Sequence, residues 1–315
     1  MKINQLFNLI RNHKTIAISG MCKNAGKTTV LNSLLGNMPG QETQALTSIG
    51  RDGENVDIVT GTEKPGIYIK EGSIFATAEG LLYSCDVTKE ILETTGMSTP
   101  LGEVVLVRAL SDGNVQLAGP SIVNQLIEIT NMFHHFEAER IIIDGSVGRK
   151  TLCTTDLADA VVLCTGASYS PDMDETIAET AHTCELLMSE VHTESEEAPY
   201  CDGANLSQLL KKEADRPACV VVNGAITDNM LDPLIRSGKL RNVCLVAYDA
   251  TKLLISSQCA EKLKTINSQL RVRKAINLAA ITINPFSAYG LHYEPTEFLR
   301  RMQSAVIVPV INVRT

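Results

Sequence analysis

The sequence lacks several features that would point to whole classes of protein. No apolar run approaches the roughly 20 residues of a membrane-spanning helix, so no membrane contact is expected. The net charge is −8 and no basic stripe is visible. A nucleic acid is therefore not expected as the main partner, because duplex binding needs a basic surface. The nine cysteines form no CxxC pair, which favours a reducing, cytoplasmic location over a disulfide framework.

Two further absences concern ligands. The six histidines show no spacing typical of metal ligands. No NKxD motif is present to support guanine specificity, so ATP is the default nucleotide if the chain binds one.

The hydrophobic pattern predicts an α/β fold. Apolar runs typical of buried parallel strands alternate with helical patterns, which indicates βαβ units and a doubly wound, mainly parallel sheet. Predicted strands cover 15–19, 43–46, 140–143, 161–164, 219–222, 243–247, 276–283 and 305–310. Predicted helices cover a short segment near residues 3–10, then 28–38, 121–136, 175–189, 228–237 and 251–266.

The domain organisation follows from where this alternation is interrupted. Within 43–118, short runs separated by Gly and Pro predict β hairpins inserted near the nucleotide site. Residues 190–204 are acidic and predict a solvated loop. We expect a nucleotide-binding core over 1–200 and an α/β extension over 201–315. The later strands either continue the first sheet or form a second small lobe.

The most informative motif is GMCKNAGKTT, residues 20–29, called the GKT loop below. A strand before it and a helix after it are the context of a phosphate-binding loop. Backbone N–H groups of 24–28 would surround a phosphate at the positive helix end. The predicted nucleotide-binding residues in this loop are Asn24, Ala25, Gly26, Lys27, Thr28 and Thr29. Lys27 would bridge the β and γ phosphates, and the Thr28 hydroxyl would ligate Mg²⁺. The alternative is a chance GKT at a helix start.

The spacing of this loop departs from the usual pattern. Five residues, not four, separate Gly20 from Gly26, and Met21 stands where the first glycine normally lies. This longer loop is similar to that of the dethiobiotin-synthetase-like branch of P-loop proteins.

Asp144 ends a second apolar strand about a hundred residues downstream. Ligands of parallel sheets bind at the carboxyl ends of strands, so Asp144 is a candidate Mg²⁺ carboxylate and, with Lys27, a candidate catalytic residue. The alternative is an ordinary Asp-Gly turn. Arg149 and Lys150 follow, and Lys150 is a third candidate catalytic residue that would contact the γ phosphate; plain solvent exposure is equally open.

Further carboxylates follow the second strand. Asp52, Glu54 and Asp57 can supply the oxygen ligands that Mg²⁺ prefers, with Asp52 and Glu54 as predicted metal ligands. A polar turn built on Asp-Gly is the alternative. Near the end of the chain, Asn284 before Pro285 is placed to read a base edge, as is Asn223 before Gly224. Turn-forming roles are the alternative for both.

Several segments together resemble the P-loop subunit of lysine 5,6-aminomutase reactivases. They are GMCKNAGKTT, IIIDGSVGRKT with TDLADAVVLCTGAS, VVNGAITD, AYDATKLLI and ITINPFSAYGL, spread over about residues 14–312. The resemblance implies a P-loop NTPase fold with ATP and Mg²⁺ as cofactors. It also implies a MutS-like ATPase partner subunit and an adenosylcobalamin-dependent aminomutase whose damaged cofactor is exchanged. Roles for Arg149, Lys150, Asp249 and Lys252 follow only from their places in these segments.

The leading hypothesis is therefore an ATP-binding, ATP-hydrolysing accessory subunit of such a reactivase. One alternative is a dethiobiotin-synthetase-like ligase or kinase acting on a small carboxylate or carbamate, with Lys64, Ser146 and Lys150 near the γ phosphate. Another is a nucleotide-binding scaffold without turnover. Whether the subunit forms a homodimer is open.

Overall fold

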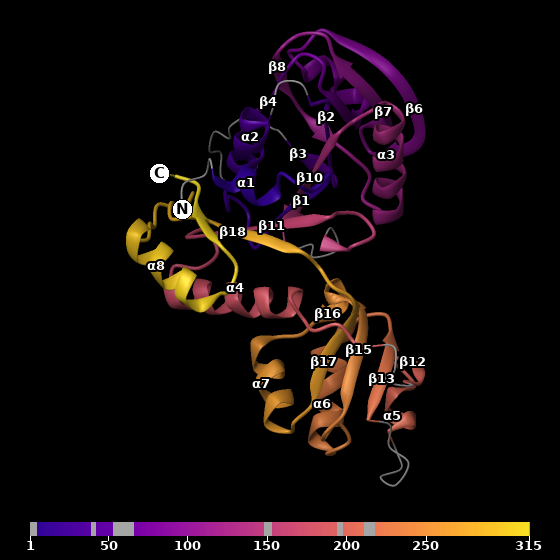
Figure 1. Cartoon of the computed structure of the whole chain (residues 1–315), viewed down its shortest axis with the longest axis vertical. Coiled ribbons are helices and arrows are strands. Elements are labelled where there is room, and N and C mark those ends of the chain that lie inside the picture. Colours follow the sequence, from indigo (N-terminus) through magenta and orange to yellow (C-terminus); the bar gives the residue numbers. More distant parts are fainter. Residues whose placement is uncertain are drawn as a thin grey trace. The chain divides into compact units, whose positions relative to one another are not determined.

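A computed structural model of the chain describes residues 5–38, 42–52, 66–147, 153–193, 198–210 and 218–314. The fold is α/β and has two compact units (Figure 1). The first unit comprises residues 1–180 and 278–315, and the second comprises residues 181–277. The chain therefore leaves the first unit, builds the second and returns.

A nine-stranded sheet forms the centre of the first unit, in the order β19-β18-β11-β1-β10-β2-β5-β7-β6. The strands from β19 to β5 pair in parallel, and β5, β7 and β6 pair antiparallel. Their bounds are β1 Thr15–Gly20, β2 Gln44–Ser48, β5 Ile74–Ala78, β6 Lys89–Thr99, β7 Gly102–Ala109, β10 Arg140–Val147, β11 Ala160–Gly166, β18 Leu278–Asn284 and β19 Val310–Asn312.

The central strands are buried on both faces, as continuous apolar runs in parallel sheets usually are. Every residue of β1 and of β11 is buried. On one face, Ile16, Leu46 and Ile142 belong to the same apolar cluster as Leu31 and Leu34 of helix α2, Lys27–Asn37. Helix α3, Val123–His135, lies on the opposite side of these strands from α2 (Figure 1). The prediction of a large, mainly parallel sheet covered by helices is confirmed.

Other helices complete this unit. The short α1, Leu6–Ile10, buries Leu6 and Ile10, as the N-terminal helical spacing predicts. Helix α4, Met173–Leu187, contains the division between the two units. Helix α8, Pro295–Ala305, begins where the Glu294 carboxylate accepts from the backbone N–H groups of Thr296 and Glu297, a capping arrangement.

The inserted β region lies where the sequence predicts it. Antiparallel pairs join β4 Ile67–Ile69 with β8 Gly113–Val115, and β3 Arg51–Asp52 with β9 Leu117–Ala118. A 3-10 helix covers Glu79–Ser84. Strand β5, however, pairs in parallel with β2, so the insertion also extends the central sheet.

The second unit has its own parallel sheet, in the order β12-β13-β15-β17. The strands are β12 Tyr200–Asp202, β13 Cys219–Asn223, β15 Cys244–Asp249 and β17 Gln269–Lys274. A small pair joins β14 Ile226–Thr227 with β16 Leu253–Leu254. The helices are α5 Leu206–Leu209, α6 Asp228–Arg236, the 3-10 helix Ala250–Lys252 and α7 Ser257–Thr265. Helices α6 and α7 contact each other and bury Leu231, Leu234 and Leu263.

Several details differ from the sequence-based expectation. Residues 190–204 are not loop throughout, because β12 covers Tyr200–Asp202. The helix expected over 251–266 begins only at Ser257, after a 3-10 helix and β16. The strand expected over 305–310 is wrong for most of its length, because α8 ends at Ala305 and β19 begins at Val310. The division into units does not follow a boundary near residue 200. Both alternatives for the later strands occur. Strands β18 and β19 extend the first sheet, while β12, β13, β15 and β17 form a second one.

Candidate functional site

The GKT loop lies at the carboxyl edge of the central sheet. It connects the end of β1 at Gly20 to the start of α2 at Lys27. Strands β10 and β11 flank β1, so their carboxyl ends lie on either side of the loop (Figure 1). Parallel α/β sheets bind their ligands at this edge.

The backbone of the loop turns through two residues with positive φ. Asn24 has φ 59° and Gly26 has φ 94°. Glycine suits the second position for two reasons. A residue with a side chain would be strained at this φ, and its Cβ would approach Val313 Cγ2 to 3.1 Å. Left-handed residues within a turn bring successive N–H groups onto one concave side, which is a common anion-binding arrangement.

Several N–H groups of this loop have no acceptor among the described residues; that of Ala25, a fully buried residue, belongs to the turn that begins at Cys22. Met21 N–H donates to the carbonyl of Cys164 at 2.8 Å, but from Cys22 to Thr29 no backbone N–H donates to any acceptor in the part of the chain that the structure describes. The side-chain nitrogen of Asn24 is buried and likewise has no partner among those residues. Helix N-termini leave such donors unsatisfied unless a cap or a ligand accepts from them, and α2 has no side-chain cap.

Lys27 has a largely buried side chain that follows the loop. Its residue is 9% exposed, and its ammonium group makes no ion pair or hydrogen bond with the described residues. The aliphatic part of the side chain passes over the end of β1, where a Cβ on Gly20 would meet Lys27 Cδ at 3.1 Å. An anionic ligand at this position would pair with the ammonium group.

Asp144 lies on the strand next to β1, at the level of the loop. It pairs with Ile18 of β1 and with Ser48 of β2, and its residue is 1% exposed. Its main-chain carbonyl accepts from the N–H of Ile49 at 3.0 Å. The sheet therefore places a buried carboxyl group one strand away from the GKT loop.

Lys27 and Asp144 both lie close enough to Cys164 to influence the pKa of its thiol. Burial raises the pKa of its thiol to about 12, with the negative charge of Asp144 adding to the rise and the positive charge of Lys27 opposing it. Both charges therefore act on one thiol at the end of β11.

Thr28, at the first turn of α2, is half-buried and its hydroxyl has no partner among the described residues. Hydroxyl and carboxylate oxygens are ligands that Mg²⁺ accepts.

The thiol inside the loop is not activated. The pKa of Cys22 is raised to about 11 by burial, an effect larger than the opposing influence of Lys27. A thiolate is the reactive form of cysteine, so Cys22 is a small side chain that fits the loop rather than a reactive group.

Asn284 connects the far end of the chain to the loop. Its side-chain N–H donates to the carbonyl of Asn24 at 3.0 Å, and its side-chain oxygen accepts from the N–H of Phe286 at 3.2 Å. The sequence predicts Asn284 near the nucleotide because it ends a strand, but nothing local in the sequence indicates its contact with Asn24. The contact of Val313 with Gly26 was not predicted either.

Other predicted site residues lie elsewhere. Glu54, Asp57, Lys64, Arg149 and Lys150 lie outside the described residues. Asp52 is described only by its backbone, in β3, and Ser146 only by its backbone, in β10.

The remaining candidates belong to the second unit. Asn223 is exposed at the end of β13. Asp249 accepts from the backbone N–H of Thr251 and so caps the 3-10 helix that contains Lys252.

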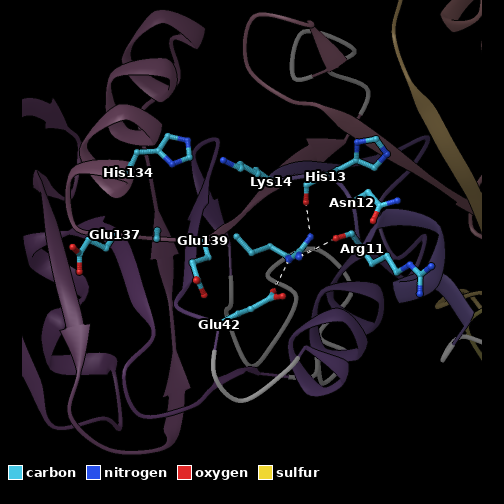
Figure 2. Close-up of a pocket in the computed structure, with 10 residues that line it drawn as sticks. Arg11, Asn12, His13, Lys14, Glu42, His134, Glu137 and Glu139 are labelled. Atoms are coloured by element: carbon cyan, nitrogen blue, oxygen red, sulfur yellow. Dashed lines mark hydrogen bonds and ion pairs between the residues drawn. The ribbon is translucent and has the colours of Figure 1, made fainter.

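A hollow of about 520 Å³ lies at the opposite, amino edge of the same sheet (Figure 2). The Arg140 guanidinium beneath it bonds Glu42 at 2.9 Å and the carbonyls of Arg11 and His13. All of these bonds are internal to the fold. Arg140 thus holds the end of α1 against the sheet, and the hollow has the character of a structural clamp rather than a ligand site.

Comparisons of the chain with protein-family models, with curated proteins and with solved structures found no match. Within the described ranges, no cluster of three or more His, Cys, Asp or Glu side chains is placed to hold a metal ion. None of the described helices is long and apolar enough to cross a membrane.

Proposed function

We propose that the chain is a P-loop protein that binds ATP with Mg²⁺ at the GKT loop. The observation that carries this proposal is the combination of N–H groups without well-formed hydrogen bonds over Cys22 to Thr29 with the unpaired ammonium group of the largely buried Lys27 side chain. A polyphosphate satisfies both at once, because its oxygens accept hydrogen bonds and its charge offsets that of the lysine.

The proposed role of each residue follows from its position. N–H groups of Asn24 to Thr28 bind the phosphates, Lys27 neutralises the β and γ phosphates, and the Thr28 hydroxyl ligates the metal. Asp144 holds the metal or one of its waters from the neighbouring strand. Bound Mg²⁺ would polarise the terminal phosphate.

We further propose, on the resemblance of the sequence segments, that nucleotide turnover drives the reactivation of an adenosylcobalamin-dependent aminomutase together with a MutS-like partner subunit. A nucleotide can only shift such a partner by binding two conformations with different affinity. The relevant conformations would differ in the segments around the γ phosphate.

A turnover assay tests this function. We expect the purified chain to bind Mg²⁺–ATP by calorimetry, to hydrolyse it slowly alone, and to hydrolyse it faster when the aminomutase and the MutS-like subunit are added. Rapid turnover that requires only a small carboxylate substrate would instead support a ligase or kinase. Binding without turnover under any of these conditions would indicate a scaffold, and no binding would refute the nucleotide site itself.

A further inference from the structure

The side chain of Asn284 has both of its polar atoms committed inside the protein. Its residue is 5% exposed, its nitrogen donates to Asn24 and its oxygen accepts from Phe286. The main-chain carbonyl of Asn284 accepts from Ala167 at 2.9 Å, which ties the end of β18 to the end of β11. Gly166 leaves room for this approach, because a Cβ there would lie 2.2 Å from that carbonyl oxygen. Asn284 is therefore a fixed point beside the GKT loop.

We propose that Asn284 is a positioning residue that sets the shape of the phosphate-binding loop, and that it does not read the base. The proposal rests on the function proposed above. It assigns to this side chain a task inside the protein, at a place where a strand-end Asn would otherwise be taken for a base contact.

The geometry of the peptide bond explains how this works. A trans peptide is planar, and its C=O and N–H groups point in opposite directions. The bond from Asn284 holds the carbonyl of Asn24 on one side of the loop. The N–H of Ala25, which belongs to the same peptide, must then point to the other side. Ala25 is fully buried, so this N–H lies inside the turn that begins at Cys22 and not on the open side of the loop. The bond from Asn284 therefore fixes the orientation of this peptide and, with it, the path of the loop.

The conformation of Asn24 makes such a restraint useful. Its φ of 59° is left-handed, a region that non-glycine residues adopt at some cost. A loop that holds this conformation only while a ligand is present would lose affinity to the ordering cost. Asn284 keeps the loop ordered beforehand, and Val313 packs against Gly26 from the adjoining strand end.

The test compares two ligands that share phosphates but not a base. Binding of Mg²⁺–tripolyphosphate and of Mg²⁺–ATP is measured by calorimetry for the wild type and for Asn284→Asp. The substitution keeps the shape but replaces the donor with an acceptor facing the Asn24 carbonyl. We expect both ligands to lose affinity by the same factor, about tenfold.

A matched control uses the neighbouring strand. Asn312 ends β19, is 3% exposed and accepts from the N–H of Arg314, and within the described residues its side chain makes no hydrogen bond to the loop. Asn312→Asp should change neither affinity by more than about twofold. Asn284→Ala is the second variant and should also weaken both ligands equally without introducing a charge.

A pH series distinguishes positioning from a general structural effect. A protonated carboxyl group can donate to the Asn24 carbonyl, and burial raises the pKa of such a group. As the pH falls from about 8 to about 5, the affinity of Asn284→Asp should therefore approach that of the wild type. The ratio of wild-type to Asn312→Asp affinity should stay constant over the same range.

Each other outcome overturns the proposal in a recognisable way. Loss of ATP affinity with unchanged tripolyphosphate affinity would show that Asn284 reads the base. Unchanged affinity for both ligands would show that the loop does not depend on it. Loss of native circular dichroism in both Asn284 variants would assign the residue to overall stability. A wild-type chain that binds neither ligand would refute the nucleotide site itself.

Discussion

At the residue scale, two side chains of opposite charge lie near the GKT loop. The Lys27 residue is 9% exposed and its ammonium group has no partner within the described ranges, while Asp144 is 1% exposed on β10, the strand next to β1. Charged side chains enclosed at the carboxyl edge of a parallel sheet often serve a ligand. The proposal accordingly assigns Lys27 to the phosphates and Asp144 to the metal.

Replacing Asp144 by Asn should weaken the metal requirement more than nucleotide binding itself. The change removes a negative charge at almost constant shape, so the Mg²⁺ concentration that gives half-maximal ATP binding should rise by about tenfold or more. Titration of Mg²⁺ at fixed ATP measures this. Asp159→Asn is the matched control, because Asp159 accepts from the N–H groups of Lys14 and Thr15 at the other edge. An identical Mg²⁺ titration for the two variants would refute the role of Asp144.

At the scale of the elements, the sequence predicts those that local patterns specify. Strands β1 and β11 were predictable because parallel strands buried on both faces are continuous apolar runs. Helix α2 was predictable from its loop motif. Strand β17 was not, because Gln269 and three basic residues make it a polar strand. Helix α8 was also missed, since Phe298 and Met302 are its only buried residues and give a weak apolar pattern.

Residues at the amino edge of the central sheet should contribute to the stability of the fold and not to ATP binding. Arg140→Ala removes the bonds to Glu42 and to the α1 carbonyls, and should lower the free energy of unfolding by about 2–4 kcal/mol. ATP affinity should stay unchanged, because the GKT loop is at the opposite edge. Denaturant unfolding and calorimetry measure the two effects. Arg108→Ala is the control, since its partially exposed ion pair with Glu90 should contribute under about 1 kcal/mol. A stable Arg140→Ala protein with impaired ATP binding would contradict this assignment.

At the scale of the whole molecule, the path of the chain was beyond local prediction. Which sheet a strand joins depends on contacts distant in sequence, and β18 returns to the first sheet after the whole second unit. The same limit applies to the site. Its motif could be found in one stretch, but Asn284 and Asn24, which share a hydrogen bond, are 260 residues apart. Pairing of this kind leaves no periodic signal in a single sequence.

The central claim, that the GKT loop binds a nucleoside triphosphate, is tested most directly by calorimetric titration of Mg²⁺–ATP into Lys27→Ala. We expect affinity to fall by about a hundredfold or more, because the substitution removes the ammonium group that the proposal assigns to the phosphates. The thermal unfolding midpoint should be unchanged or higher, because that group has no partner in the described fold. Lys23→Ala, which removes an exposed lysine from the same loop, should bind ATP nearly as the wild type does. Wild-type affinity in Lys27→Ala would contradict the account.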